Sequence, residues 1–255
     1  MAGTVSGIRT IAITYRILIR QLVTTGRMIA LSLIGLAVVL VGWSVGNAER
    51  NEFFLDAESI ATLRQEDAVF IISLIGFTIL VPVVALVFAA ATLGDMREDG
   101  TLLYLWLRPM PRWAVAAGAW LSSLTISLPL TLIPLGLTAL ALDTDTELVV
   151  ATLLATAIGV IAYTALFVLL GTLVRNAIVW GLGYVIIWEG IVAAFGTAAA
   201  KVAVRGYTSS ILTARTDIEI EVGNSTQTTA ILVPLLIALG ALTLASLRLG
   251  SLEVE

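Results

Sequence analysis

Six runs of mostly apolar residues constrain this chain more than any other feature. A helix needs about 20 consecutive apolar residues to cross a bilayer. The predicted spans are residues 28–46, 68–94, 113–142, 148–174, 177–196 and 229–249. Only 13% of the 255 residues are charged, against about 25% in a soluble domain. We therefore predict an all-α integral membrane protein with a single transmembrane domain over residues 1–255.

The third predicted span carries two prolines, Pro129 and Pro134. Each proline removes a backbone hydrogen-bond donor, and its ring clashes with the carbonyl four residues earlier. We predict that the helix bends at these two positions.

The residue types on which most membrane enzymes depend are missing. The chain has no cysteine and no histidine, which excludes disulfides, thiolate nucleophiles, Ser-His pairs and His-Glu-x-x-His zinc sites. It has no Gly-x-x-x-x-Gly-Lys-Ser/Thr loop, so it cannot hold nucleotide phosphates in a P-loop. A stand-alone membrane protease or acyltransferase would need Ser/Lys or aspartate chemistry, and the single lysine, Lys201, lies in a predicted outer loop.

Basic residues are divided unevenly between the two sets of loops. One side would carry Arg9, Arg16, Arg20, Arg27, Arg97, Arg108, Arg112, Arg175 and Arg248, and the other Arg50, Arg64, Lys201, Arg205 and Arg215. Acidic residues show the opposite bias. Because an excess of Lys and Arg in short loops marks the cytoplasmic side, we expect both termini and residues 95–112 in the cytoplasm. The expected location is the plasma membrane of a prokaryote, with the chain crossing it several times.

Residues 8–27 have the periodicity of an amphipathic helix. At about 100° per residue, Arg9, Arg16, Arg20 and Arg27 fall close together around its axis. This pattern is typical of an interfacial helix with its apolar face in lipid and its arginines near anionic headgroups. The helix either only anchors the chain and helps to set its topology, or also offers a cytosolic contact surface.

Two longer segments lie on the predicted outer side. Residues 47–67 are polar and acidic, which predicts a short helix or loop. Within residues 197–228, we predict a short helix over 198–212 and a loop over 216–222. Asn224 begins an Asn-Ser-Thr glycosylation sequon, which matters only in an organism that has the machinery.

Glu189 is the one ionisable residue well inside a predicted span. A charged group at that depth costs a few kcal/mol on insertion scales, so it should face protein or water. One interpretation is a helix-packing role, in which Glu189 is hydrogen-bonded to a serine or threonine of the third span. The other places Glu189 in a substrate path or outer gate.

The segment of residues 95–112 is too apolar for a simple connector. Thr101 can cap a short helix, with Asp99 near its N-terminus, where negative charge is favourable. The aromatic and aliphatic residues from Leu102 to Leu107 give the segment apolar surface almost all round. Some of that surface must be covered by lipid and some by protein.

This segment resembles the one that follows the second span in permeases of the type-2 ABC exporter family. The shared pattern is acid-x-Gly-Thr-Leu, an apolar run, and Pro-x-x-Arg before the next span. The matching residues are Glu98, Gly100, Thr101, Leu102, Pro109 and Arg112. The layout is also similar: an N-terminal interfacial helix, six spans, a short turn after the fourth, and a larger outer segment before the sixth.

The resemblance implies a half-transporter in which two permease chains, identical or paralogous, pair with two separate ATPase subunits. The ATPases would bind ATP and Mg²⁺, and this chain would bind no cofactor directly. Residues 95–112 would be the coupling helix that contacts the ATPase, and its coupling residues would be Glu98, Gly100, Thr101, Leu102, Tyr104, Trp106, Arg108, Pro109 and Arg112. The exported substrate would be lipidic, amphipathic or drug-like. Membrane lipid is an expected partner and nucleic acid is not.

A second hypothesis is a non-transporting membrane anchor or regulatory subunit with the same fold. Such a subunit could also recruit an ATPase, so binding alone does not separate the two. Substrate-stimulated ATP hydrolysis by the reconstituted complex would separate them.

Overall fold

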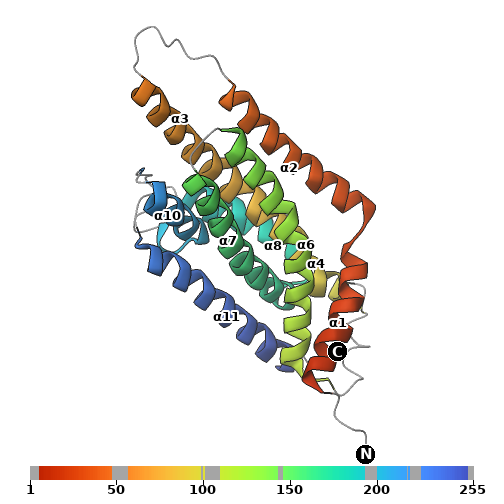
Figure 1. Ribbon diagram of the computed structural model, residues 1–255. Coiled ribbons are helices and arrows are strands. Elements are labelled where there is room, and N and C mark those ends of the chain that lie inside the picture. Colours follow the sequence, from red (N-terminus) through yellow and green to blue (C-terminus); the bar gives the residue numbers. More distant parts are fainter. Residues whose placement is uncertain are drawn as a thin grey trace, which may run out of the picture.

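A computed structural model describes residues 6–47, 57–98, 100, 110–142, 146–192, 200–216, 218 and 225–251, without the side chains of residues 57–62 and 64. The elements in this part of the chain are helices (Figure 1). They are α1 (Gly7–Leu22), α2 (Thr25–Gly46), α3 (Ala57–Ile71), η2 (Ile72–Leu80), α4 (Val81–Glu98), α6 (Arg112–Ala141), α7 (Thr146–Leu173), α8 (Ala177–Gly183), η3 (Tyr184–Ile191), α10 (Val204–Thr216) and α11 (Gln227–Ser251). The elements η2 and η3 are π-helical and the others are α-helical.

Five helical stretches of the described chain are long and apolar enough to cross a membrane. They are Thr25–Gly46, Gln65–Glu98, Arg112–Ala141, Thr146–Leu173 and Gln227–Ser251. The fifth predicted span corresponds to α8 and η3, which together cover Ala177–Ile191. At the α-helical rise of 1.5 Å per residue these 15 residues reach at most about 22 Å, less than the roughly 30 Å of a bilayer core. Its crossing of the membrane stays a prediction.

Helix α7 lies at the centre of the bundle. In its most apolar window 61% of residues are buried, against 22% for α2 and 28% for α11. It packs against α4, α6, α10 and α11. Gly171 allows the approach of α4, because a Cβ there would lie 3.1 Å from the carbonyl oxygen of Ala90. Such close contacts matter in lipid, where helix association depends on van der Waals packing rather than on the hydrophobic effect.

The N-terminal helix is shorter than the sequence predicts. Helix α1 ends at Leu22, two residues break the helix, and α2 begins at Thr25. The prediction of one helix over residues 8–27 is therefore wrong about its C-terminal end, and Arg27 belongs to α2. One face of α1, formed by Thr10, Thr14, Leu18 and Leu22, is buried. Helix α1 packs against α6, so this face contacts protein, and a position at the membrane interface stays a prediction.

Helices α1 and α2 follow α6 along its length. A Cβ on Gly7 would meet Trp113, and one on Gly42 would meet Thr138, near the other end of α6. Helix α6 runs unbroken through both Pro129 and Pro134. A Cβ at Gly35 in α2 would lie 2.8 Å from Cγ of Pro134, so this glycine makes room for the proline ring.

The two ends of the bundle differ. Figure 1 shows the start of α1 and the end of α11 at one end, low in the view, and α10 with the start of α3 at the other. We call these the terminal end and the far end. At the far end, residues 57–67 form the first turns of α3, so the predicted short element over 47–67 is in part an extension of the second span. The predicted helix over residues 198–212 is displaced, since α10 covers Val204–Thr216.

Candidate functional site

The last turn of α4 begins the segment that the sequence singles out, at the terminal end. Helix α4 ends at Glu98, and Gly100 has a φ of +68°. Its backbone N–H donates to the carbonyl of Arg97 at 3.4 Å. A residue in the left-handed conformation just after a helix is a common way to end it, and glycine adopts that conformation without a Cβ penalty. Gly100 therefore sets the direction in which the chain leaves α4.

Two polar contacts tie the end of α4 to its neighbours. Arg27 Nη2 in α2 lies 2.9 Å from Asp95 Oδ2, an ion pair of half-buried side chains. Arg97 Nη1 donates to the carbonyl of Thr172 near the end of α7, at 2.9 Å. The helix that leads into the segment is thus linked to α2 on one side and to α7 on the other.

The structure locates three of the nine predicted coupling residues. Glu98 is exposed at the end of α4, Gly100 follows it, and half-buried Arg112 opens α6. The others, Thr101, Leu102, Tyr104, Trp106, Arg108 and Pro109, lie outside the described residues, as do Asp99 and Asn224. Arg27, Asp95 and Arg97 were not among the predicted coupling residues, although the acid-x-Arg spacing of Asp95 and Arg97 at the end of an apolar run is visible in the chain.

Glu189 forms a second site at the far end, where its side chain is fully buried. Its Oε1 accepts a hydrogen bond from the backbone N–H of Val204 at 3.1 Å, and its Oε2 accepts one from Arg205 N–H at 3.0 Å. These N–H groups open α10, and the first N–H groups of a helix have no partner within it. The carboxylate thus caps α10 from another helix, in a position where negative charge is favourable.

Tyr184 supplies a third hydrogen bond to the same carboxylate. Its hydroxyl donates to Glu189 Oε1 at 2.8 Å, and both residues belong to η3. In an α-helix of 3.6 residues per turn, residues five apart would point about 140° away from each other. In a π-helix, where hydrogen bonds join residues five apart, they lie on one face. The π-helical geometry of η3 therefore brings Tyr184 and Glu189 together.

Arg205 makes the link between η3 and α10 reciprocal. Its Nη1 donates to the backbone carbonyl of Glu189 at 3.4 Å, while its own N–H is capped by the carboxylate. Burial lowers the pKa of the Arg205 guanidinium, and the neighbouring Tyr163 and Glu189 oppose that shift. Since an arginine side chain stays protonated in proteins, the site holds a cation beside the Glu189 side chain.

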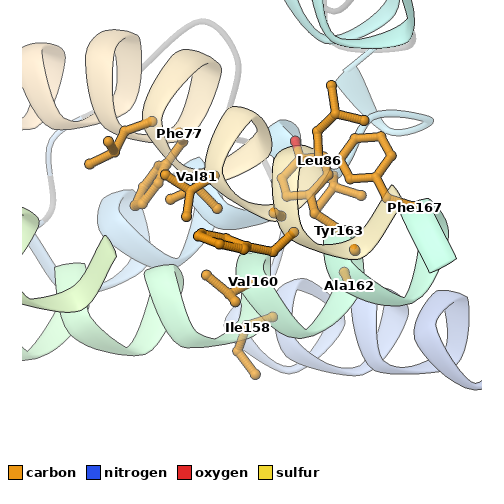
Figure 2. Close-up of a cluster of buried hydrophobic side chains, with 14 of the residues drawn as sticks. Phe77, Val81, Leu86, Ile158, Val160, Ala162, Tyr163 and Phe167 are labelled. Atoms are coloured by element: carbon orange, nitrogen blue, oxygen red, sulfur yellow. The ribbon is translucent and has the colours of Figure 1, made fainter. Parts of the chain in front are cut away.

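Aromatic side chains of α7 and η3 pack beside this polar site. Tyr163 and Phe167 of α7 stack with ring centroids 6.0 Å apart, and Phe167 meets Tyr184 edge-on at 6.0 Å. Figure 2 shows Tyr163 and Phe167 beside Leu86 of α4, within the buried cluster that also contains Phe77 and Val81. Glu189 is fully buried beside these aromatic side chains, and low-dielectric surroundings strengthen its hydrogen bonds.

Glu189 joins η3 to α10 through hydrogen bonds, although its partners differ from the predicted ones, and its place in a substrate path or outer gate stays a prediction. A serine or threonine of the third span was the expected partner, but the observed ones are Tyr184 and the start of α10. The sequence signal for this site was a single ionisable residue within an apolar run, because such a residue requires a polar partner. No sequence pattern pointed to Val204 and Arg205. Only the three-dimensional fold brings the start of α10 next to η3.

Among the described residues no group of three or more acidic side chains could hold a metal ion. No family model, curated protein or solved structure matches the chain. The fold defines the class of protein: this chain is a multi-pass α-helical membrane protein.

Proposed function

We propose that this chain is the permease subunit of an ATP-driven ABC transporter of the type-2 exporter family, driven by separate ATPase subunits. The carrying observation is the segment from Glu98 to Arg112, with its acid-x-Gly-Thr-Leu and Pro-x-x-Arg pattern. A lipidic, amphipathic or drug-like substrate is consistent with a chain that is 59% apolar.

The geometry at the terminal end supports the proposal in a specific way. The segment connects α4 to α6, and α4 is linked to α2 through Arg27–Asp95 and to α7 through Arg97–Thr172. A force applied to the segment by an ATPase would thus reach four helices at once. That is the mechanical requirement for a coupling element, because nucleotide-driven closure elsewhere has to reorient the spans.

The test is co-purification of the tagged chain with an ATPase that contains a P-loop, from its own membranes. We expect the wild-type chain to capture such a subunit, and Glu98→Arg or Thr101→Pro to lose it while the variant still inserts. The matched control is Glu147→Arg, because Glu147 is also exposed but lies in the first turn of α7 at the far end. Failure of the wild-type chain to capture any P-loop subunit would refute the proposal.

Co-purification with a P-loop subunit is also expected of a non-transporting anchor or regulatory subunit. Reconstituted complexes separate the two functions, since a transporter should hydrolyse ATP faster when a transported lipid or drug is added. An ATPase rate that no candidate substrate changes would favour the anchor.

A further inference from the structure

Helix α10 is held by one polar side chain from each of two π-helices. Glu189 of η3 caps its first turn through Val204 N–H and Arg205 N–H. On the η2 side, Ser73 Oγ lies 2.9 Å from Ser209 Oγ, and both side chains are buried. The two π-helices also contact each other. Segments that are distant in sequence therefore converge on one short helix at the far end.

The contact between η3 and α10 depends on the π-helical geometry of η3. Tyr184 and Glu189 share a hydrogen bond only because residues five apart face the same way in a π-helix. Rewound as an α-helix, the same residues would point about 140° apart. Such a change would turn the Glu189 carboxylate away from Tyr184, from α10, or from both.

We infer that α10 is a latch that η3 closes in its π-helical form and releases when it rewinds. The closed form is the resting one, because a carboxylate turned away from its donors at membrane depth is costly. Release therefore needs work from elsewhere in the protein. π-Helical segments are rare and occur often at functional sites, in keeping with a conformational role. This inference goes beyond the proposed function, and its first test does not depend on an ATPase.

The absence of native cysteine makes the latch directly measurable. The double variant Ser73→Cys/Ser209→Cys places two thiols where the hydroxyl oxygens lie 2.9 Å apart, within reach of a disulfide. The reduced full-length chain in lipid nanodiscs is exposed to N-ethylmaleimide for increasing times; thiols at these two buried positions react only when α10 opens. The remaining thiols are then counted by the gel shift that a polyethylene glycol maleimide produces.

Removal of the cap should loosen α10. Because labelling proceeds through the minor open form, its rate follows the open fraction, and we expect Glu189→Ala to speed N-ethylmaleimide labelling about tenfold, in line with the loss of a helix cap. Glu189→Gln should lie between, because its amide oxygen still accepts a hydrogen bond while its NH₂ meets the N–H of Arg205. Glu147→Ala, which changes an exposed glutamate at the same end, should leave the rate unchanged.

The decisive comparison is Glu189→Ala against Glu147→Ala, and equal rates would overturn the inference. If Glu189→Ala does not yield a monodisperse protein, Tyr184→Phe takes its place. It removes one hydrogen bond from the carboxylate and leaves both α10 contacts in place. It should speed N-ethylmaleimide labelling about threefold, roughly the effect of losing one such bond. A rate equal to that of Glu147→Ala would again overturn the inference.

A second measurement tests whether α10 has to move away from η2 and η3 during the transport cycle. In the assembled transporter, oxidation of the Ser73→Cys/Ser209→Cys pair should stop substrate transport, and dithiothreitol should restore it. Transport that continues at full rate with the disulfide intact would overturn the latch. Failure to find any ATPase partner would count against the proposed function alone, because the labelling rates do not involve one.

Discussion

Substitutions at Gly100 test how the coupling segment leaves α4. A Cβ at this position would meet no heavy atom within 4 Å, so space does not oppose a larger residue. The cost comes from the backbone, whose φ of +68° is unfavourable for a residue with a Cβ. For alanine this conformation costs roughly 1–2 kcal/mol. Asparagine tolerates it better, and valine, which is β-branched, tolerates it worst.

The expected order of stability at this turn is Gly100, then Gly100→Asn, Gly100→Ala and Gly100→Val. If the turn opens, Gly100 N–H no longer caps the carbonyl of Arg97 and the last turn of α4 frays. A loss of 1–2 kcal/mol corresponds to about five- to thirtyfold faster amide exchange in that turn. The assay is hydrogen–deuterium exchange of the peptide that covers residues 93–100 in nanodiscs.

Gly250→Ala serves as the control, because its Cβ would also meet nothing within 4 Å, in the last turn of α11. It should leave exchange at residues 93–100 unchanged. Equal exchange for glycine, asparagine and alanine at position 100 would show that the left-handed turn does not end α4, and the reasoning would fail.

Two further predictions concern the links between helices. Exchanging the charges of Arg27 and Asp95 one at a time should lower the thermal stability of the chain in nanodiscs, and the double exchange should recover most of it. The pair is partly exposed, so the effect should stay below about 1 kcal/mol, and an unrecovered double variant would contradict the pairing. Gly171→Val should destabilise the chain by about 1–3 kcal/mol, because the larger side chain overpacks the contact with α4. Gly240→Ala is the control and should not destabilise the chain, because a Cβ there meets no heavy atom within 4 Å. Equal thermal midpoints for the two variants would argue against the α4–α7 contact.

The sequence was sufficient to predict the helical stretches because their signal is local. A run of about 20 apolar residues has few alternatives in a membrane, and five of the six predicted spans correspond to long apolar helices. Helix ends were harder to place. The break between Leu22 and Thr25 contains no glycine or proline, and Thr24, a common N-cap residue type, makes no side-chain capping bond there. The extension of α3 to Ala57 was hidden by polar residues that an outer segment tolerates.

The Glu189 site shows which features a sequence cannot supply. Its charge in an apolar run predicted a protected partner, and the carboxylate does have three hydrogen-bond donors. The donors belong to a turn 15 and 16 residues further on and to Tyr184, five residues back. Five-residue spacing excludes contact in an α-helix, and π-helical winding has no recognisable sequence signature. The site therefore became visible only in three dimensions.

The central claim is that residues 95–112 contact an ATPase, and photo-cross-linking tests it most directly. A benzoyl-phenylalanine in place of Tyr104 should, in membranes of the native host, form an adduct with a subunit that mass spectrometry identifies by its P-loop peptide. The same probe in place of Leu140, exposed near the far end of α6, should form no such adduct. Adducts of the Tyr104 probe that contain only lipid or this chain itself would contradict the claim.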